Sequence, residues 1–310
     1  MNRKSFLHKS LLSSSLLLVP ELAHNTFSAA VGKISMKLAI RDRNQKNICA
    51  TCGARYASAK TNTDTCPVCQ DERQYVGNNG QVWLSYNEVA KGRSIRITQL
   101  QPDLYDLKTT PSFAIDQKAH LVISKSGNIL WDCIPFLDEQ TATYIHSIGG
   151  IKAIAISHPH YYSLMAEWAN AFDCPIYLHE QDKQWIQDKS EHIRLWKGEK
   201  MELWDDIKIV HVAGHFAGST VLHLPHHGTK SALLTGDSIY VARDRKHVSF
   251  MYSYPNLIPL PKQAIELIQK RVEPLAFDSI YGAFEGQVIP SGAKGAFNRS
   301  VARYLNIFNV

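Results

Sequence analysis

The sequence predicts an α/β fold in which a layered domain follows a small cysteine-rich module. Strands and helices alternate from about residue 105 onward, a pattern typical of layered α/β domains. Upstream of that region, four of the six cysteines occur as two CxxC pairs. At roughly 150 residues per domain, 310 residues are enough for one large domain with a small appendage. Hydrophobic and charged fractions of 45% and 20% indicate a globular, soluble protein.

We expect three segments along the chain: a leader or disordered extension over residues 1–35, the cysteine module with its linker over residues 36–100, and the layered domain over residues 101–310. The first twenty residues pass from a basic start into a leucine and serine run that is too short to span a bilayer. Residues 1–30 resemble a twin-arginine export leader with Lys4 in place of the second arginine, which implies a periplasmic protein. The cysteines, spaced like metal ligands, and a possible start at Met36 favour a cytoplasmic protein instead.

The charge of the chain argues against a nucleic-acid partner. The formal net charge is +6, and the basic residues of segment 1–35 outnumber its one acid, Glu21. The positive charge that remains on the two folded segments is too small for an electrostatic footprint on nucleic acid. We therefore expect a small-molecule substrate and no membrane span, and the sequence does not predict the oligomeric state.

The two CxxC pairs predict a structural metal site. Cys49, Cys52, Cys66 and Cys69 stand in "CATCG" and "CPVCQ", and each pair supplies a short turn whose sulfur atoms can bind one tetrahedral ion. The fragments resemble the knuckles of zinc ribbons and of the rubredoxin-like modules of rubrerythrins. We expect zinc in preference to iron, and because so short a segment builds little core, the metal would supply most of its folding energy.

The layered domain is predicted from the order of its elements. A hairpin with a Ser-Gly-Asn turn over 119–133 precedes a helix that ends at two glycines and a buried strand over 151–157. Apolar residues at helical spacing follow, and the second half alternates again before two final helices. Helices are expected over 138–150, 161–173, 180–189, 261–272 and 291–308, and strands over 151–157, 174–179, 201–214, 219–228, 231–241 and 277–284.

Three fragments at the ends of predicted strands carry the candidate chemistry. They are "SHPHYYS" from residue 157, "GHFAGST" from residue 214 and "TGDSIY" from residue 235. Together with "ILWDC", which ends near Asp132, they resemble the motifs of the metallo-β-lactamase superfamily over roughly residues 105–290. The resemblance implies a four-layer αββα sandwich with metals bound in a groove along the sheet edges, in a glyoxalase II-like branch. Strand ends are also where layered folds place their chemistry.

The resemblance implies one metal site and the loss of another. His158, His160 and His215 match the histidines of the first metal site, and Asp237 matches the aspartate that bridges two metals. The second site's own ligands are replaced, because its aspartate position holds Tyr162, its histidine position holds Ser163 and a late histidine is matched by Glu285. Three imidazoles suffice for one ion and leave a fourth position for water or for Asp237. We expect Asp237, Tyr162 and Glu285 to be the catalytic groups, with Tyr162 as a hydrogen-bond donor and Glu285 as a base or an extra ligand.

Three functions follow as hypotheses. The first is a hydrolase that uses a hydroxide bound to a single zinc ion on an ester, thioester or lactone-like carbonyl, since one zinc can lower the pKa of water to about 7. The second is a mononuclear iron dioxygenase of the persulfide dioxygenase type, in which two histidines and Asp237 bind Fe²⁺. The third is a metal-binding sensor or scaffold without catalysis.

Overall fold

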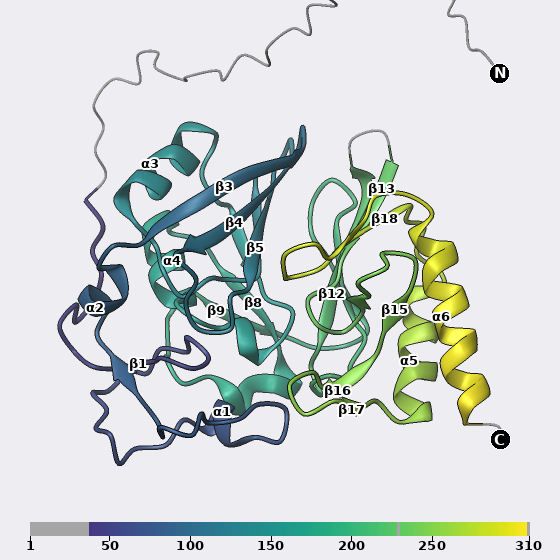
Figure 1. Ribbon diagram of the computed structural model, residues 1–310. Helices are drawn as coiled ribbons and strands as arrows, with labels where there is room; N and C mark the ends of the chain where they lie inside the picture. The colour runs from purple at the N-terminus through teal and green to yellow at the C-terminus, as the bar shows by residue number, and fades with distance from the viewer. Residues whose placement is uncertain (1–36, 228–229, 309–310) are drawn as a thin grey trace, which may run out of the picture. The chain divides into compact units, whose positions relative to one another are not determined.

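The computed structural model describes residues 37–227 and 230–308 and shows an α/β/β/α layering (Figure 1). Two β-sheets face each other, with α3 (Glu139–Ser147) and α4 (Met165–Phe172) outside the first sheet and α5 (Lys262–Val272) and α6 (Ala293–Ile307) outside the second. The predicted four-layer fold class is confirmed. The leader expected over residues 1–35 lies outside the described residues.

The first sheet changes from antiparallel to parallel along its width. Neighbouring strands are antiparallel from β3 to β6 and parallel from β6 to β9. Helices α3 and α4 make the crossovers that parallel pairing requires. Its described strands are β3 (Ser94–Gln101), β4 (Leu104–Thr110), β5 (Lys118–Val122), β6 (Ile129–Trp131), β7 (Ala153–Ala155), β8 (Ile176–His179) and β9 (Ile193–Trp196).

The second sheet is mostly antiparallel. Its order is β10-β11-β12-β13-β18-β19, and β13 and β18 are the parallel neighbours in the described part of the chain. These strands are β10 (Lys200–Glu202), β11 (Lys208–His211), β12 (Thr220–His227), β13 (Lys230–Leu234), β18 (Ser279–Tyr281) and β19 (Val288–Ile289). Two short antiparallel pairs lie between β13 and α5: β14 (Tyr240–Val241) with β15 (Val248–Ser249), and β16 (Met251–Ser253) with β17 (Ile258–Pro259).

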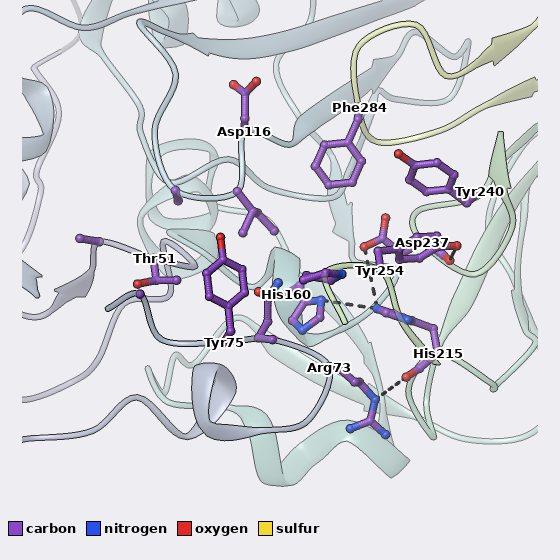
Figure 2. A pocket seen from close by; sticks show the side chains of 16 residues that line it. Thr51, Arg73, Tyr75, Asp116, His160, His215, Asp237, Tyr240, Tyr254 and Phe284 are labelled. Carbon is purple, nitrogen blue, oxygen red and sulfur yellow. Dashed lines mark hydrogen bonds and ion pairs between the residues drawn. The ribbon is translucent and has the colours of Figure 1, made fainter. Parts of the chain in front are cut away.

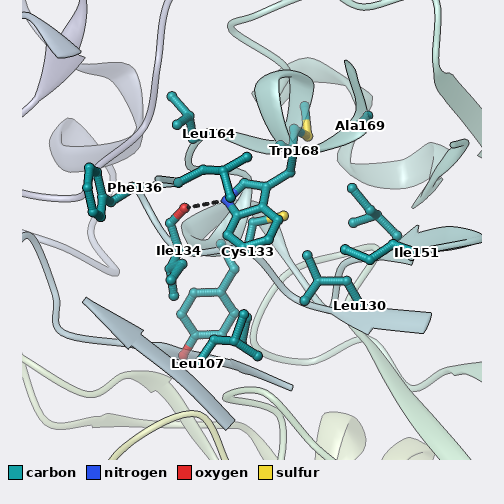
Figure 3. Close-up of a cluster of buried hydrophobic side chains, with 14 of the residues drawn as sticks. Leu107, Leu130, Cys133, Ile134, Phe136, Ile151, Leu164, Trp168 and Ala169 are labelled. Carbon is teal, nitrogen blue, oxygen red and sulfur yellow. Dashed lines mark hydrogen bonds between the residues drawn. The ribbon is translucent and has the colours of Figure 1, made fainter. Parts of the chain in front are cut away.

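The buried side chains form layers that match the sheets. Between the sheets, Trp131 and Ile129 from the first pack with Leu222 and Leu234 from the second. On the outer face of the first sheet, Trp168 lies at the centre of a larger cluster and donates from Nε1 to the Ile134 carbonyl at 3.3 Å (Figure 3). At roughly 25 cal/mol per Å² of apolar surface, these layers supply most of the driving force that holds the sheets in place.

The cysteine segment packs against the same folded unit. It contains β1 (Ile48–Cys49) and β2 (Trp83–Leu84), the one-turn helix α1 (Pro67–Gln70) and α2 (Tyr86–Ala90) with a Ser85 capping box. A small apolar cluster surrounds the cysteines. Arg55 forms a buried ion pair with Glu167 of α4 at 2.7 Å, which ties the segment to the first sheet's helical layer.

Between β8 and β10, two elements differ from the sequence prediction. The helix expected over 180–189 is a 3₁₀ helix, η2 (Glu180–Trp185), and β9 follows where no strand was predicted. Strand β9 is a four-residue strand at the edge of the sheet, and its Leu195 is exposed. An edge strand needs no long apolar run, so its sequence does not carry the pattern that marks a buried strand. Within the described ranges, no helix is both long and apolar enough to cross a membrane.

Candidate metal centre

Four buried side chains from three loops meet at one end of the facing sheets. His158 and His160 follow β7 in a short 3₁₀ helix, η1 (Pro159–Tyr161), with His158 as its N-cap. His215 lies in the loop between β11 and β12, and Asp237 follows β13. One ligand atom from each of the four lies within 4.8 Å of the others. The structure therefore brings together the residues that the sequence predicted as ligands of the first metal.

The spacing of these atoms fits a single metal ion. His158 Nε2 lies 3.4 Å from Asp237 Oδ2, His215 Nε2 lies 3.8 Å from the same oxygen, and His160 Nδ1 lies 3.4 Å from His215 Nε2. Bonds of about 2.0–2.1 Å to a tetrahedral ion place ligand atoms about 3.3–3.4 Å apart. His158 Nε2 is also buried without a hydrogen-bond partner among the described residues, which is costly unless an ion binds it.

Burial keeps two of the imidazoles neutral and able to bind a cation. It lowers the pKa of His215 to about 3, with a further contribution from nearby His158. The pKa of His160 is also lowered well below its usual value, first by burial and then by His158 and His215. Burial alone would raise the pKa of Asp237, but attraction to the nearby rings of His158 and His215 and the hydrogen bond from Tyr161 lower it below its ordinary value. The centre thus combines neutral imidazoles with an ionised carboxylate, a donor set that suits zinc or Fe²⁺.

Outer hydrogen bonds orient His158 and His215. The hydroxyl of Ser157 lies 2.9 Å from His158 Nδ1, and His215 Nδ1 donates to the Met251 carbonyl at 3.0 Å. Such contacts leave the Nε2 atom of each ring facing the centre. Ser157 is itself held by Asp132, whose Oδ1 accepts from the Ser157 backbone N–H at 2.6 Å, and burial raises the pKa of Asp132 to about 8.

A tyrosine that the sequence analysis did not select contacts the aspartate. Tyr161, not Tyr162, donates its hydroxyl to Asp237 Oδ1 at 2.6 Å. The sequence analysis chose Tyr162 because it stands at the aspartate position of the motif that the chain resembles. The backbone after His158 turns into a 3₁₀ helix, where residues three apart lie on one side, so Tyr161 is brought next to His158 instead. The ring centroids of His158 and Tyr161 are accordingly 4.3 Å apart. Burial, reinforced by Asp237, raises the pKa of Tyr161 well above 10, so the phenol remains a donor.

The other predicted second-site positions lie away from the four ligands. Tyr162 is buried beside a different small cavity that Trp185 and Met165 line. Ser163 accepts a hydrogen bond from Gln117 at 2.9 Å. Glu285 is 61% exposed and forms an ion pair with Arg96 at 2.8 Å, which lowers its pKa. The structure does not bring Tyr162 or Glu285 to the metal centre, because one follows a turn and the other points into solvent.

An open cavity of about 680 Å³ leads to the metal centre, within the range of about 300–1,000 Å³ of ligand pockets. His160, His215 and Asp237 line its inner end (Figure 2). Tyr240 and Tyr254 stack at a centroid distance of 4.3 Å on one side, with Phe284 above them. The opposite side comes from the cysteine segment, and the residues that it contributes are Ala50, Thr51, Arg73, Gln74, Tyr75 and Gly77.

The four cysteines form a second centre with the geometry of a tetrahedral sulfur site. Cys49 Sγ lies 3.7 Å from Cys69 Sγ, and Cys52 Sγ lies 3.6 Å from Cys66 Sγ, so these pairs are thiols and not disulfides. Metal–sulfur bonds of about 2.3 Å give edges of about 3.8 Å. Gln81 Nε2 also donates to Cys49 Sγ at 3.1 Å. The residues fit a structural ion, as the CxxC spacing predicted.

The fold and the two centres define the class of protein. The chain is similar to the structure of the DIM-1 metallo-β-lactamase, with 15% identity, a TM-score of 0.50 and coverage of 67% of this chain and 96% of that chain. It resembles VMB-1 and TMB-1 with TM-scores of 0.52 each, at 15% and 12% identity and over 69% and 67% of this chain, covering 98% and 96% of those chains. This is therefore a protein of the metallo-β-lactamase fold.

No protein-family model matches the chain. It is 46% identical over 265 residues to the uncharacterized protein YmaE of Bacillus subtilis (strain 168), an alignment that covers 84% of this chain and 96% of YmaE. The chain belongs to the family of YmaE.

Proposed function

We propose that the protein is a hydrolase that uses one zinc ion at His158, His160, His215 and Asp237 to cleave an ester, thioester or lactone-like carbonyl. The observation that carries this proposal is the set of four ligand atoms within 4.8 Å of one another at the inner end of an open cavity. A zinc ion bound there would lower the pKa of a water molecule to about 7 and so supply a nucleophile at neutral pH. The shared fold with a metallo-β-lactamase supports the proposal.

The residues around the centre have separate tasks in this proposal. Tyr161 holds Oδ1 of Asp237, so Oδ2 faces the imidazoles. Tyr254 fixes the same residue by donating to its backbone carbonyl at 2.8 Å. The rings of Tyr240 and Phe284 border the cavity and would contact the apolar part of a substrate (Figure 2). Tyr240 also lines the cavity, and in this proposal its hydroxyl would donate to a substrate carbonyl.

A single ion at this centre is supported by the side chains at the second-site positions. Ser163 is engaged with Gln117 and Glu285 with Arg96, and Tyr162 lies on the far side of the turn. Oδ1 of Asp237 accepts a hydrogen bond from the hydroxyl of Tyr161 and so is already engaged. The proposal does not require a second metal, because one ion suffices to activate water.

Metal analysis combined with an activity survey tests the proposal. Protein purified without added metal is expected to hold one equivalent of zinc beyond the cysteine centre and to hydrolyse members of a panel of esters, thioesters and lactones. His158→Ala should lose the extra equivalent and the activity, and Asp237→Asn should lower both. Iron at the extra equivalent together with oxygen consumption on a persulfide substrate would favour the dioxygenase instead. Metal at the cysteines alone would refute the proposal.

A further inference from the structure

A single arginine joins the cysteine segment to the backbone of a metal ligand. Arg73 stands four residues after Cys69 and donates from Nε to the carbonyl oxygen of His215 at 2.6 Å (Figure 2). We propose that Arg73 is a positioning residue through which the cysteine centre sets the metal affinity of the His/Asp centre. This inference rests on the metal site of the proposed function.

The guanidinium of Arg73 is held in one place. Its central carbon lies 4.3 Å from the ring centroid of Phe216 and 4.2 Å from that of Tyr252. Nη1 donates to Asp71 at 2.6 Å, and only 14% of the side chain is exposed. A planar cation between two aromatic rings has little rotational freedom. The donor that faces His215 is therefore fixed in direction as well as distance.

The segment around Arg73 and the ring of His215 share a second support. Ser253 donates from its hydroxyl to the Arg73 carbonyl at 3.1 Å, and Asn256 donates to the Glu72 carbonyl at 2.8 Å. Both belong to the β16–β17 hairpin, whose Met251 carbonyl accepts from His215 Nδ1 at 3.0 Å. His215 is thus held at its backbone by Arg73 and at its ring by the hairpin that Arg73's segment contacts. A shift of that segment would move both contacts.

The conformation of the Arg73 segment depends on the cysteine centre. Asp71, which pairs with Arg73, is the C-cap of α1, a four-residue helix that contains Cys69 and follows Cys66. A helix of one turn is not stable by itself in water, so its backbone is maintained by packing and by the metal that the thiolates bind. Removing that metal would free Asp71 and Arg73 together, and His215 would lose its backbone donor.

The test compares Arg73→Met with Arg93→Met in the full chain. Arg93 is a matched control, since Nη1 donates to the Val89 carbonyl at 2.7 Å and the guanidinium lies 4.9 Å from the Phe113 ring, in a contact that involves neither centre. Co²⁺ is titrated into metal-free protein, and the two centres are followed separately, because thiolate ligands give charge-transfer absorption that imidazole and carboxylate ligands do not. Arg73→Met should weaken Co²⁺ binding at the His/Asp centre by about 10–100-fold and leave the cysteine centre unchanged.

The dependence of the His/Asp centre on the cysteine centre is measured by the same Co²⁺ titration. In wild type, emptying the cysteine centre should weaken the His/Asp centre by a similar factor, and Arg73→Met should remove that dependence. Equal affinity of wild type and Arg73→Met at the His/Asp centre would overturn the inference, whereas absence of Co²⁺ binding there in wild type would overturn the proposed function. If Arg73→Met does not fold, Arg73→Lys takes its place. Failure of both to fold beside a folded Arg93→Met would show a purely structural role and overturn the inference.

Discussion

Replacing Tyr161 with phenylalanine removes one oxygen atom from the centre and leaves the ring in place. The lost hydrogen bond is 2.6 Å long and joins a fully buried phenol to Asp237, a residue that is 4% exposed. Hydrogen bonds to charged groups contribute about 1.5–3 kcal/mol, and Oδ1 would be left without its donor. We therefore expect the free energy of unfolding of the metal-free protein to fall by about 1.5–3 kcal/mol.

The same substitution should weaken metal binding. Without its donor, the Asp237 carboxylate can rotate and Oδ2 no longer stays 3.4 Å from His158 Nε2. Outer hydrogen-bond partners of metal ligands are typically worth about 10–100-fold in affinity, which corresponds to roughly 1.4–2.7 kcal/mol. Competition with a chromophoric chelator measures the zinc dissociation constant, and urea unfolding measures the stability.

Tyr162→Phe is the control, because it removes a hydroxyl from the neighbouring residue, which lines a different cavity. It should leave zinc affinity within about threefold of wild type, well below the effect of losing an outer partner. An unchanged dissociation constant in Tyr161→Phe, or a larger loss in Tyr162→Phe, would refute the assignment of Tyr161.

Three further substitutions test the surroundings of the centre. Burial raises the pKa of Asp182 from 3.8 to about 7 despite a hydrogen bond from Gly218, so the folded state favours the protonated acid and Asp182 should destabilise wild type as the pH rises from about 4 to 7. In urea unfolding at several pH values, Asp182→Asn should lose less stability over this range than wild type, by on the order of 4 kcal/mol; an equal loss in both would contradict the assignment. Gly236→Ala should abolish zinc binding, because Gly236 has φ +50° and a Cβ there would lie 2.7 Å from the Cβ of Ser157, the residue that contacts His158. Metal analysis tests this, and retained zinc would contradict it. Tyr75→Ala should raise KM at least several-fold, since Tyr75 borders the cavity. It should leave zinc content and Tm unchanged, because the residue is 57% exposed. An unchanged KM would exclude Tyr75 from the substrate site.

Residues near a recognisable strand end could be selected from the sequence. His158, His160, His215 and Asp237 each follow a buried strand, and their choice as one set came from the resemblance of their motifs to those of the metallo-β-lactamase superfamily. In the structure the four side chains lie together, because the loops that carry them are at one end of the facing sheets. The CxxC pairs were predictable for a more local reason, because each pair closes its own turn around a metal.

Contacts that depend on local backbone detail could not be read from the sequence. The motif resemblance pointed to Tyr162, but one 3₁₀ turn placed Tyr161 beside Asp237. Strand β3 lies within the stretch that the sequence assigned to a linker, since only Ile95 and Ile97 alternate on an otherwise exposed edge. In both places the sequence signal was only a few residues long. The 3₁₀ turn at Pro159–Tyr161 and the pairing of β3 with β4 decided the structure there.

By itself the sequence determined the layered fold class and the cysteine set that could hold a metal, because periodicity and short spacing record these features locally. The motif resemblance added the four candidate ligands of the His/Asp centre and their order along the chain. Only the tertiary structure decided which groups support the ligands. Tyr161 reaches Asp237 across 76 positions and Arg73 reaches His215 across 142. Contacts at such separations leave no periodic trace in a single sequence, since they form only when packed sheets and a docked cysteine segment fix both partners within about 3 Å.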